Sequence, residues 1–83
     1  MRDTYYESLI VNYDTEQVVA TRTDMGTSTA MRWIQAELRF REGNLQGICH
    51  EWVYNDLVGE PVIHRTAHVN LGDQQFNFEQ VTR

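Results

Sequence analysis

Three histidines and one cysteine are the residues of this chain whose types and spacing could support metal or acid–base chemistry. His50 directly follows Cys49, and His64 and His68 are spaced as His-x-x-x-His. On a β-strand, His64 and His68 would face the same side about 13–14 Å apart, because each residue advances a strand by about 3.3–3.4 Å. Zinc–imidazole bonds are only about 2.0–2.1 Å long. We therefore predict no metal site, and we keep a ligand- or metal-binding module on the His50, His64 and His68 face as an alternative.

Nucleophilic catalysis is not indicated by the sequence. Neighbouring strand residues project to opposite faces, so His50 is not placed to activate Cys49. The chain contains no Gly-rich phosphate loop, no Gly-x-Ser-x-Gly, no His-Glu-x-x-His and no Cys-x-x-Cys motif. It also has no lysine for Schiff-base chemistry. We expect no enzymatic activity, no catalytic residue and no cofactor.

The charge of the chain is acidic. Twelve Asp and Glu residues against seven Arg give a net charge of −5 and a pI near 5.0. This balance disfavours direct binding of nucleic acid, which needs a basic surface, and it favours a protein partner with a basic surface. The candidate contact residues are carboxylates in predicted turns, where binding residues often lie: Asp14, Glu16, Asp56 and Glu60. A structural explanation also stands, because turns favour Asp and net charge favours solubility.

The elements that must position these side chains follow from hydrophobic periodicity. Alternation predicts strands over residues 5–13 and 17–23, joined as a hairpin, and three more over residues 45–54, 62–71 and 75–81. Between the second and third strands, candidate N-caps and a glycine near the end bracket a helix over residues 27–44. The order β-β-α-β-β-β predicts an α+β fold, with one helix on one face of a mostly antiparallel sheet. We expect residues 1–83 to form a single domain.

Aromatic residues recur in the predicted strands, where they could in principle stack on RNA bases. They are Tyr5, Tyr13, Trp52, Tyr54, Phe76 and Phe78. The acidic charge and the missing basic Gly-Phe strand signature oppose that function. We expect Trp52, Phe76 and Phe78 to pack beneath the helix instead.

The apolar arc of the predicted helix is wider than one sheet face needs. Its members span on the order of 220° on a helical wheel, against the roughly 100° stripe of a surface helix, and are Ala30, Met31, Trp33, Ile34, Ala36, Leu38 and Phe40. We expect Trp33 to be mostly buried, and either Trp33 or Phe40 to extend the core over the sheet edge. Alternatively, one of them, with Met31, anchors a partner or a second copy. A homodimer through this surface or an edge strand is a further expectation.

Targeting signals are not evident. Residues 1–4 lack an apolar signal region, and no run approaches the ~18 apolar residues of a membrane span. One cysteine cannot form an internal disulfide. We expect no membrane association and a cytoplasmic location.

The acidic charge, the small size, the strand hairpin and the helix start Thr27-Ser28-Thr29-Ala30 together resemble small phage-encoded inhibitors of the anti-CRISPR type. The resemblance covers the whole chain as architecture and charge. It implies a non-enzymatic protein–protein interaction module that occupies a binding surface on a host protein complex, in the host cell cytoplasm. It assigns no inhibitor residue to any position. A small structural subunit that assembles with itself is another alternative.

Overall fold

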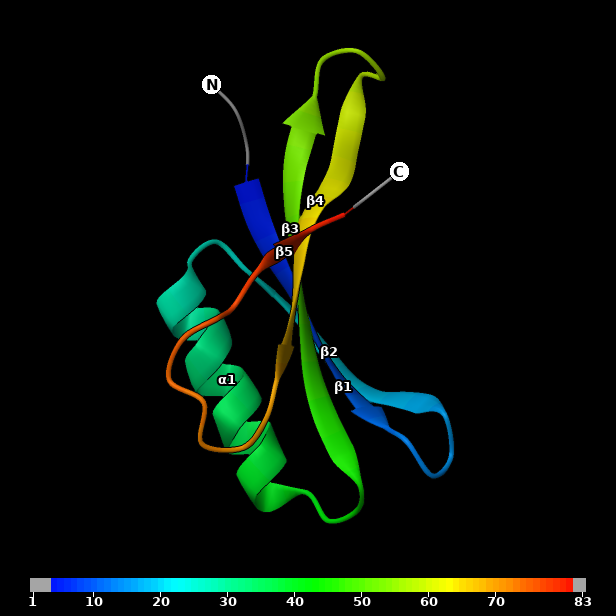
Figure 1. Cartoon of the computed structure of the whole chain (residues 1–83), viewed down its shortest axis with the longest axis vertical. Helices are drawn as coiled ribbons and strands as arrows, with labels where there is room; N and C mark the ends of the chain where they lie inside the picture. Colours follow the sequence, from blue (N-terminus) through cyan, green and yellow to red (C-terminus); the bar gives the residue numbers. More distant parts are fainter. Residues whose placement is uncertain (1–3, 82–83) are drawn as a thin grey trace.

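Five strands and one helix make up the computed structural model, which describes residues 4–81 (Figure 1). Along the chain they are β1 (Thr4–Asn12), β2 (Gln17–Asp24), α1 (Thr27–Phe40), β3 (Leu45–Asn55), β4 (Glu60–Val69) and β5 (Glu79–Gln80). The strands form one antiparallel sheet in the order β2-β1-β3-β4-β5, and α1 lies on one face of it. The predicted α+β class and the element order are confirmed.

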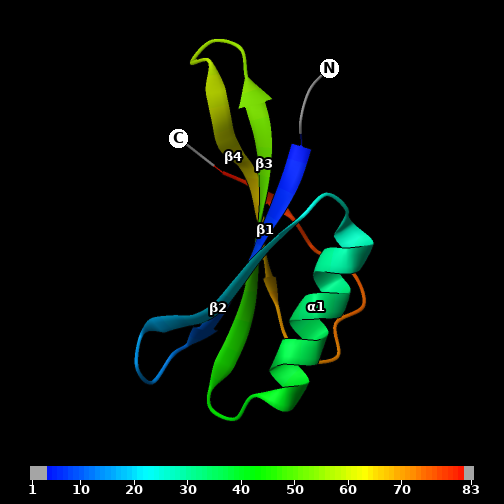
Figure 2. The ribbon, with the colours of Figure 1, turned by 180° about the vertical axis from the view of Figure 1, so that it is seen from behind.

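The helix covers only part of the sheet. Figures 1 and 2 show the β3–β4 hairpin extending well past the N-terminal end of α1, and the turn of the β1–β2 hairpin lying at the other end of the sheet. The longest dimension is 41 Å, against 25 and 19 Å for the other two. Both hairpin turns therefore project away from the helix-covered body.

Helix α1 ends earlier than its apolar pattern predicts. Gly26 is the extended N-cap residue, and Thr29 Oγ1 donates to its carbonyl oxygen at 3.1 Å. The last turn closes when Arg41 N donates to Glu37 O at 3.0 Å, after which Arg41 is extended. Gly43 has a φ of +122°, which favours glycine and lets the chain reverse into β3. The helix therefore stops at Phe40 rather than at residue 44.

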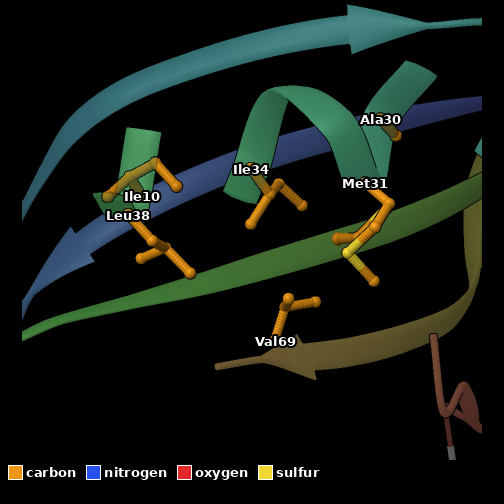
Figure 3. Close-up of a cluster of buried hydrophobic side chains, with 7 residues drawn as sticks. Ile10, Ala30, Met31, Ile34, Leu38 and Val69 are labelled. Atoms are coloured by element: carbon orange, nitrogen blue, oxygen red, sulfur yellow. The ribbon is translucent and has the colours of Figure 1, made fainter. Parts of the chain in front are cut away.

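The apolar core lies between α1 and the sheet (Figure 3). Its buried members are Ile10, Ala30, Met31, Ile34, Leu38, Cys49 and Val69. A Cβ added to Gly47 of β3 would lie 2.5 Å from Ile34 Cγ2, so glycine is needed for α1 to approach the sheet this closely. Fully burying one such aliphatic side chain contributes roughly 1.5–3 kcal/mol.

The C-terminal strand is much shorter than predicted. Among residues 4–81, Glu79 and Gln80 pair with β4 and Val81 N donates to His64 O at 3.3 Å, although the sequence alternates over residues 75–81. Phe76 and Phe78 are partly buried and pack against the apolar core instead. Gln35 of α1 holds the start of this segment, because its side chain donates to Asn70 O at 3.0 Å and accepts from Gly72 N at 2.8 Å. In both views the segment runs along one side of α1 (Figures 1 and 2).

Candidate functional site

The four candidate carboxylates lie at two opposite ends of the molecule. Asp14 and Glu16 are in the β1–β2 turn, next to Asn12, which pairs with Leu45 at the start of β3. Asp56 follows the far end of β3, and Glu60 is the first residue of β4. The ten steps from Leu45 to the end of β3 correspond to about 33 Å of strand. The carboxylates therefore form two separate pairs and not one acidic surface.

The β3–β4 turn presents two apolar side chains that the sequence reasoning missed. Leu57 is 96% exposed and Val58 is 58% exposed. Asn55 fixes the turn, because its Oδ1 accepts from Leu57 N at 2.8 Å and from Val58 N at 3.3 Å. Gly59 closes it with a 2.8 Å hydrogen bond to Asn55 O and a φ of +73°. The sequence signal for this feature was the apolar pair Leu57-Val58 within the turn-like segment of residues 55–59.

The wide apolar arc of α1 divides between core and surface. Met31 is buried in the apolar core and cannot anchor a partner as proposed for it. Trp33 is partly buried and packs against the core. Phe40 is 79% exposed, so it does not extend the core over the sheet edge. The apolar arc is wider than the sheet face requires because it includes Phe40, whose side chain is exposed to solvent.

A groove of about 300 Å³ lies between α1 and the edge strand β2. It is lined by Arg22, Thr29, Arg32, Trp33 and Ala36. Phe40 follows Ala36 by one helical turn, so the stripe of Trp33 and Ala36 continues toward it. Among residues 4–81, two arginines and no carboxylate line the groove, although the whole chain is acidic. Sequence reasoning missed Arg22 and Arg32 as a pair, because only the packing of α1 beside β2 brings them together.

A buried carboxylate lies on the helix-facing side of the sheet, beyond the apolar core. Glu51 is 6% exposed, and its two oxygens accept from Arg65 Nε and Nη2, each at 2.7 Å. Tyr6 donates its hydroxyl to Glu51 Oε2 at 3.1 Å, and His64 Nδ1 lies 2.9 Å from Oε1. The Arg65 hydrogen bonds are the main reason that the pKa of Glu51 falls from its ordinary 4.5 to about 2. We call Tyr6, Glu51, His64 and Arg65 the carboxylate cluster.

The histidines do not share one face as the sequence predicted. The pairing of β3 with β4 shifts between Glu51 and Trp52, and this bulge brings His64 to Glu51. His50 instead hydrogen-bonds Thr66, with Nδ1 and Oγ1 2.9 Å apart, and His68 pairs with Ile48. Burial lowers the pKa of His50. Within residues 4–81, no group of three His, Cys, Asp or Glu residues is arranged to hold a metal ion.

Cys49 and Trp52, for which the sequence also made predictions, lie on opposite faces of the sheet. Cys49 is buried in the apolar core, and burial raises the pKa of its thiol to about 11, so it is not a thiolate at neutral pH. Trp52 does not pack beneath the helix. It stacks on Tyr5 with ring centroids 6.0 Å apart, and its Nε1 donates to Glu7 Oε1 at 3.1 Å. The prediction for Trp52 was wrong because a strand residue next to the helix-facing Glu51 points to the other face.

Comparison of the chain with protein-family models, with curated proteins and with solved structures finds no match. The described part of the chain contains no helix with the length and apolar character that a membrane span requires.

Proposed function

We propose that this protein is a non-enzymatic protein-interaction module that inserts its β3–β4 turn into a basic surface on a partner protein. The observation that carries the proposal is the 96% exposure of Leu57 on a hydrogen-bonded turn. A large exposed aliphatic side chain gains free energy when a partner covers it, and a turn already held by Asn55 loses little conformational entropy on binding.

Charge supports the choice of a basic partner surface. Asp56 and Glu60 flank the apolar pair, and the chain carries a net charge of −5. Long-range attraction to a basic surface increases the association rate, and burial of Leu57 and Val58 slows dissociation. With the resemblance to anti-CRISPR-type inhibitors, this arrangement supports an inhibitor that blocks a host protein complex in the cytoplasm, without contacting nucleic acid itself.

The test is site-specific photo-crosslinking from the turn. A benzoylphenylalanine replaces Leu57 in one sample and Leu71 in a control, because Leu71 is 59% exposed and lies beyond the end of β4 that is opposite to the β3–β4 turn. We expect the Leu57 probe to crosslink to one host protein, and the Leu57→Ser/Val58→Ser variant to lose that protein in pull-downs. The Leu71→Ser control should retain it, and salt should weaken the complex.

Equal crosslinking from both positions, or unchanged affinity of the Leu57→Ser/Val58→Ser variant, would refute the turn as the contact. Circular dichroism of both variants checks that the fold is intact. A Glu60→Gln variant then isolates the charge contribution, and we expect it to reduce affinity at low salt more than at high salt.

A further inference from the structure

We propose that the groove between α1 and β2 binds an extended acidic peptide segment of a partner, which adds to β2 as an outer strand of the sheet. This second binding surface lies on the body of the molecule and not on its projecting turn. The inference is independent of the function proposed for the β3–β4 turn.

The outer edge of β2 is a long available edge of the sheet. Among the described residues β2 pairs with β1 alone, because it ends the strand order β2-β1-β3-β4-β5. It runs for eight residues without glycine or proline, and six of the eight are exposed. On the opposite side, the described part of β5 has two residues, which pair with Arg65 and Thr66 of β4, and the open part of the β4 edge before them contains Pro61, which opposes strand addition. An unpaired edge of this length presents a row of backbone donors and acceptors that an extended peptide can satisfy.

The groove supplies the side-chain contacts that make strand addition selective. An added strand places alternate side chains toward α1, where Trp33 and Ala36 line the groove. Phe40, 79% exposed and one turn further along α1, extends this apolar stripe. One apolar peptide side chain over Trp33 would cover surface that the fold itself leaves open.

The charge of the groove defines the occupant as acidic. Within residues 4–81, no carboxylate forms an ion pair with Arg32. Arg22 uses Nε for a 3.2 Å contact with Asp24 Oδ1, and half of its side chain is exposed. A guanidinium has five N–H donors, so Arg22 retains donors for a peptide carboxylate. A second copy docked by its own β2 would bring the same two arginines toward these, which like-charge repulsion opposes.

The experiment measures binding of an end-capped, fluorescein-labelled peptide TEVFVET to the full chain by fluorescence anisotropy. In an extended strand its two glutamates and its phenylalanine share one face. Two control peptides separate the contributions. TQVFVQT removes the charge, and TEPFVET keeps both glutamates and the phenylalanine while placing a proline inside the strand, where it opposes strand pairing. We expect both controls to bind at least about tenfold more weakly.

The protein variants are matched in charge. Arg22→Gln/Arg32→Gln removes the groove arginines, whereas Arg39→Gln/Arg41→Gln removes two arginines that do not line the groove. We expect about a tenfold loss of affinity for TEVFVET in the first variant and less than about twofold in the second. Equal losses in both variants, or equal binding of the proline peptide, would overturn the proposal.

Sedimentation velocity across protein concentrations tests the competing occupant. We expect the peptide to bind a monomer. A dimer that persists in the presence of the peptide but disappears in a Thr21→Pro variant of β2 would overturn the proposal. That result would show that the β2 edge binds a second copy of the chain. Leu57→Ser/Val58→Ser should bind TEVFVET normally, which keeps a failure here distinct from a failure of the turn.

Discussion

Two neighbouring regions on the same face of the sheet are stabilised by different kinds of interaction. Beneath α1, the apolar core brings together aliphatic side chains from the helix, β1 and β4, with Ile10, Ile34 and Val69 completely buried. Two residues along β3 from Cys49 of this core, the same face carries Glu51 with its partners Tyr6, His64 and Arg65. The sheet continues past the helix, and there a polar cluster replaces the apolar packing.

The two regions differ because α1 is too short to cover the whole length of the sheet (Figures 1 and 2). Where α1 covers the sheet, the free energy comes from burying nonpolar surface, which is not directional, and burying a polar group there without a hydrogen bond costs free energy. Beyond α1, Phe78 gives partial cover, with the Arg65 guanidinium carbon 4.5 Å from its ring centroid. A buried carboxylate is stable there only because two strands supply the donors. The apolar core should therefore respond to volume changes, and the carboxylate cluster to protonation.

The largest expected effect is in the apolar core. Ile34→Ala removes a completely buried side chain and leaves a cavity facing Gly47 of β3, and should cost about 4 kcal/mol of unfolding free energy. Urea unfolding followed by tryptophan fluorescence measures the loss. Arg39→Ala, on the exposed side of the same helix, is the control and should change stability by less than about 0.5 kcal/mol. Similar midpoints for the two variants would contradict the assignment of the core.

The next effect is expected at Glu51. Glu51→Gln keeps the size of the side chain but removes the charge that binds Arg65, and should cost about 2–3 kcal/mol at pH 7, less than a fully buried pair because Arg65 is partly exposed. The pKa of Glu51 is about 2 in the folded state and 4.5 ordinarily. This stabilisation is therefore complete above about pH 4.5 and is lost as pH falls toward 2.

Urea unfolding of wild type and Glu51→Gln at several pH values checks this prediction. The difference in unfolding free energy between them should shrink steadily as pH falls from 5 to 2.5. The cost of Ile34→Ala should stay constant over the same range, because no charge changes there. A pH-independent cost of Glu51→Gln would show that the carboxylate is not held in its charged form by Arg65.

A smaller effect is expected from filling the close contact between α1 and β3. Gly47→Ala places a Cβ 2.5 Å from Ile34 Cγ2 and 3.3 Å from Val69 Cβ, so the side chains must shift. We expect a loss of about 1–2 kcal/mol. In the double variant Gly47→Ala/Ile34→Ala, the Ile34 Cγ2 that the new Cβ would meet is absent. Part of the clash is then relieved, and a double-mutant cycle would show favourable coupling. Purely additive costs would mean that Gly47 is needed for its backbone rather than for space.

The apolar core was largely predictable from the sequence, and the carboxylate cluster was not. Helical spacing placed Ala30, Ile34 and Leu38 on one face, and alternation found the four long strands. The alternation of Phe76 and Phe78 resembled a strand, but those rings pack against each other, with centroids 5.0 Å apart, and against the apolar core. Local periodicity predicts which residues are buried, but it does not predict which other residues they contact in the fold.

The position of His64 shows most clearly why the candidate sites could not be found from the sequence. Strict alternation along β4 places it on the face of His68, whereas one bulge turns it to Glu51. The register of β3 with β4 also creates the Glu51–Arg65 pair, from residues 14 positions apart. The α1–β2 groove likewise depends on where the helix lies across the sheet. All three features depend on register or packing, which no window of sequence specifies.

The smallest expected effect tests whether the carboxylate cluster acts as a network. Tyr6→Phe removes the hydroxyl that donates to Glu51 Oε2 at 3.1 Å and keeps the ring, which lies 6.1 Å from Phe78 between centroids. We expect a loss of about 1 kcal/mol at pH 7. Tyr13→Phe is the matched control, because Tyr13 is exposed and donates to the uncharged Gln46 side chain. If the Tyr6 hydroxyl helps to hold Glu51 ionised, the stability cost of Tyr6→Phe should decline below pH 4.5. The same cost should largely disappear in the Glu51→Gln background. The cost of Tyr13→Phe should change in neither case. A Tyr6→Phe cost that persists unchanged in Glu51→Gln would reduce the cluster to the Arg65 pair alone, with the tyrosine contributing only the packing of its ring.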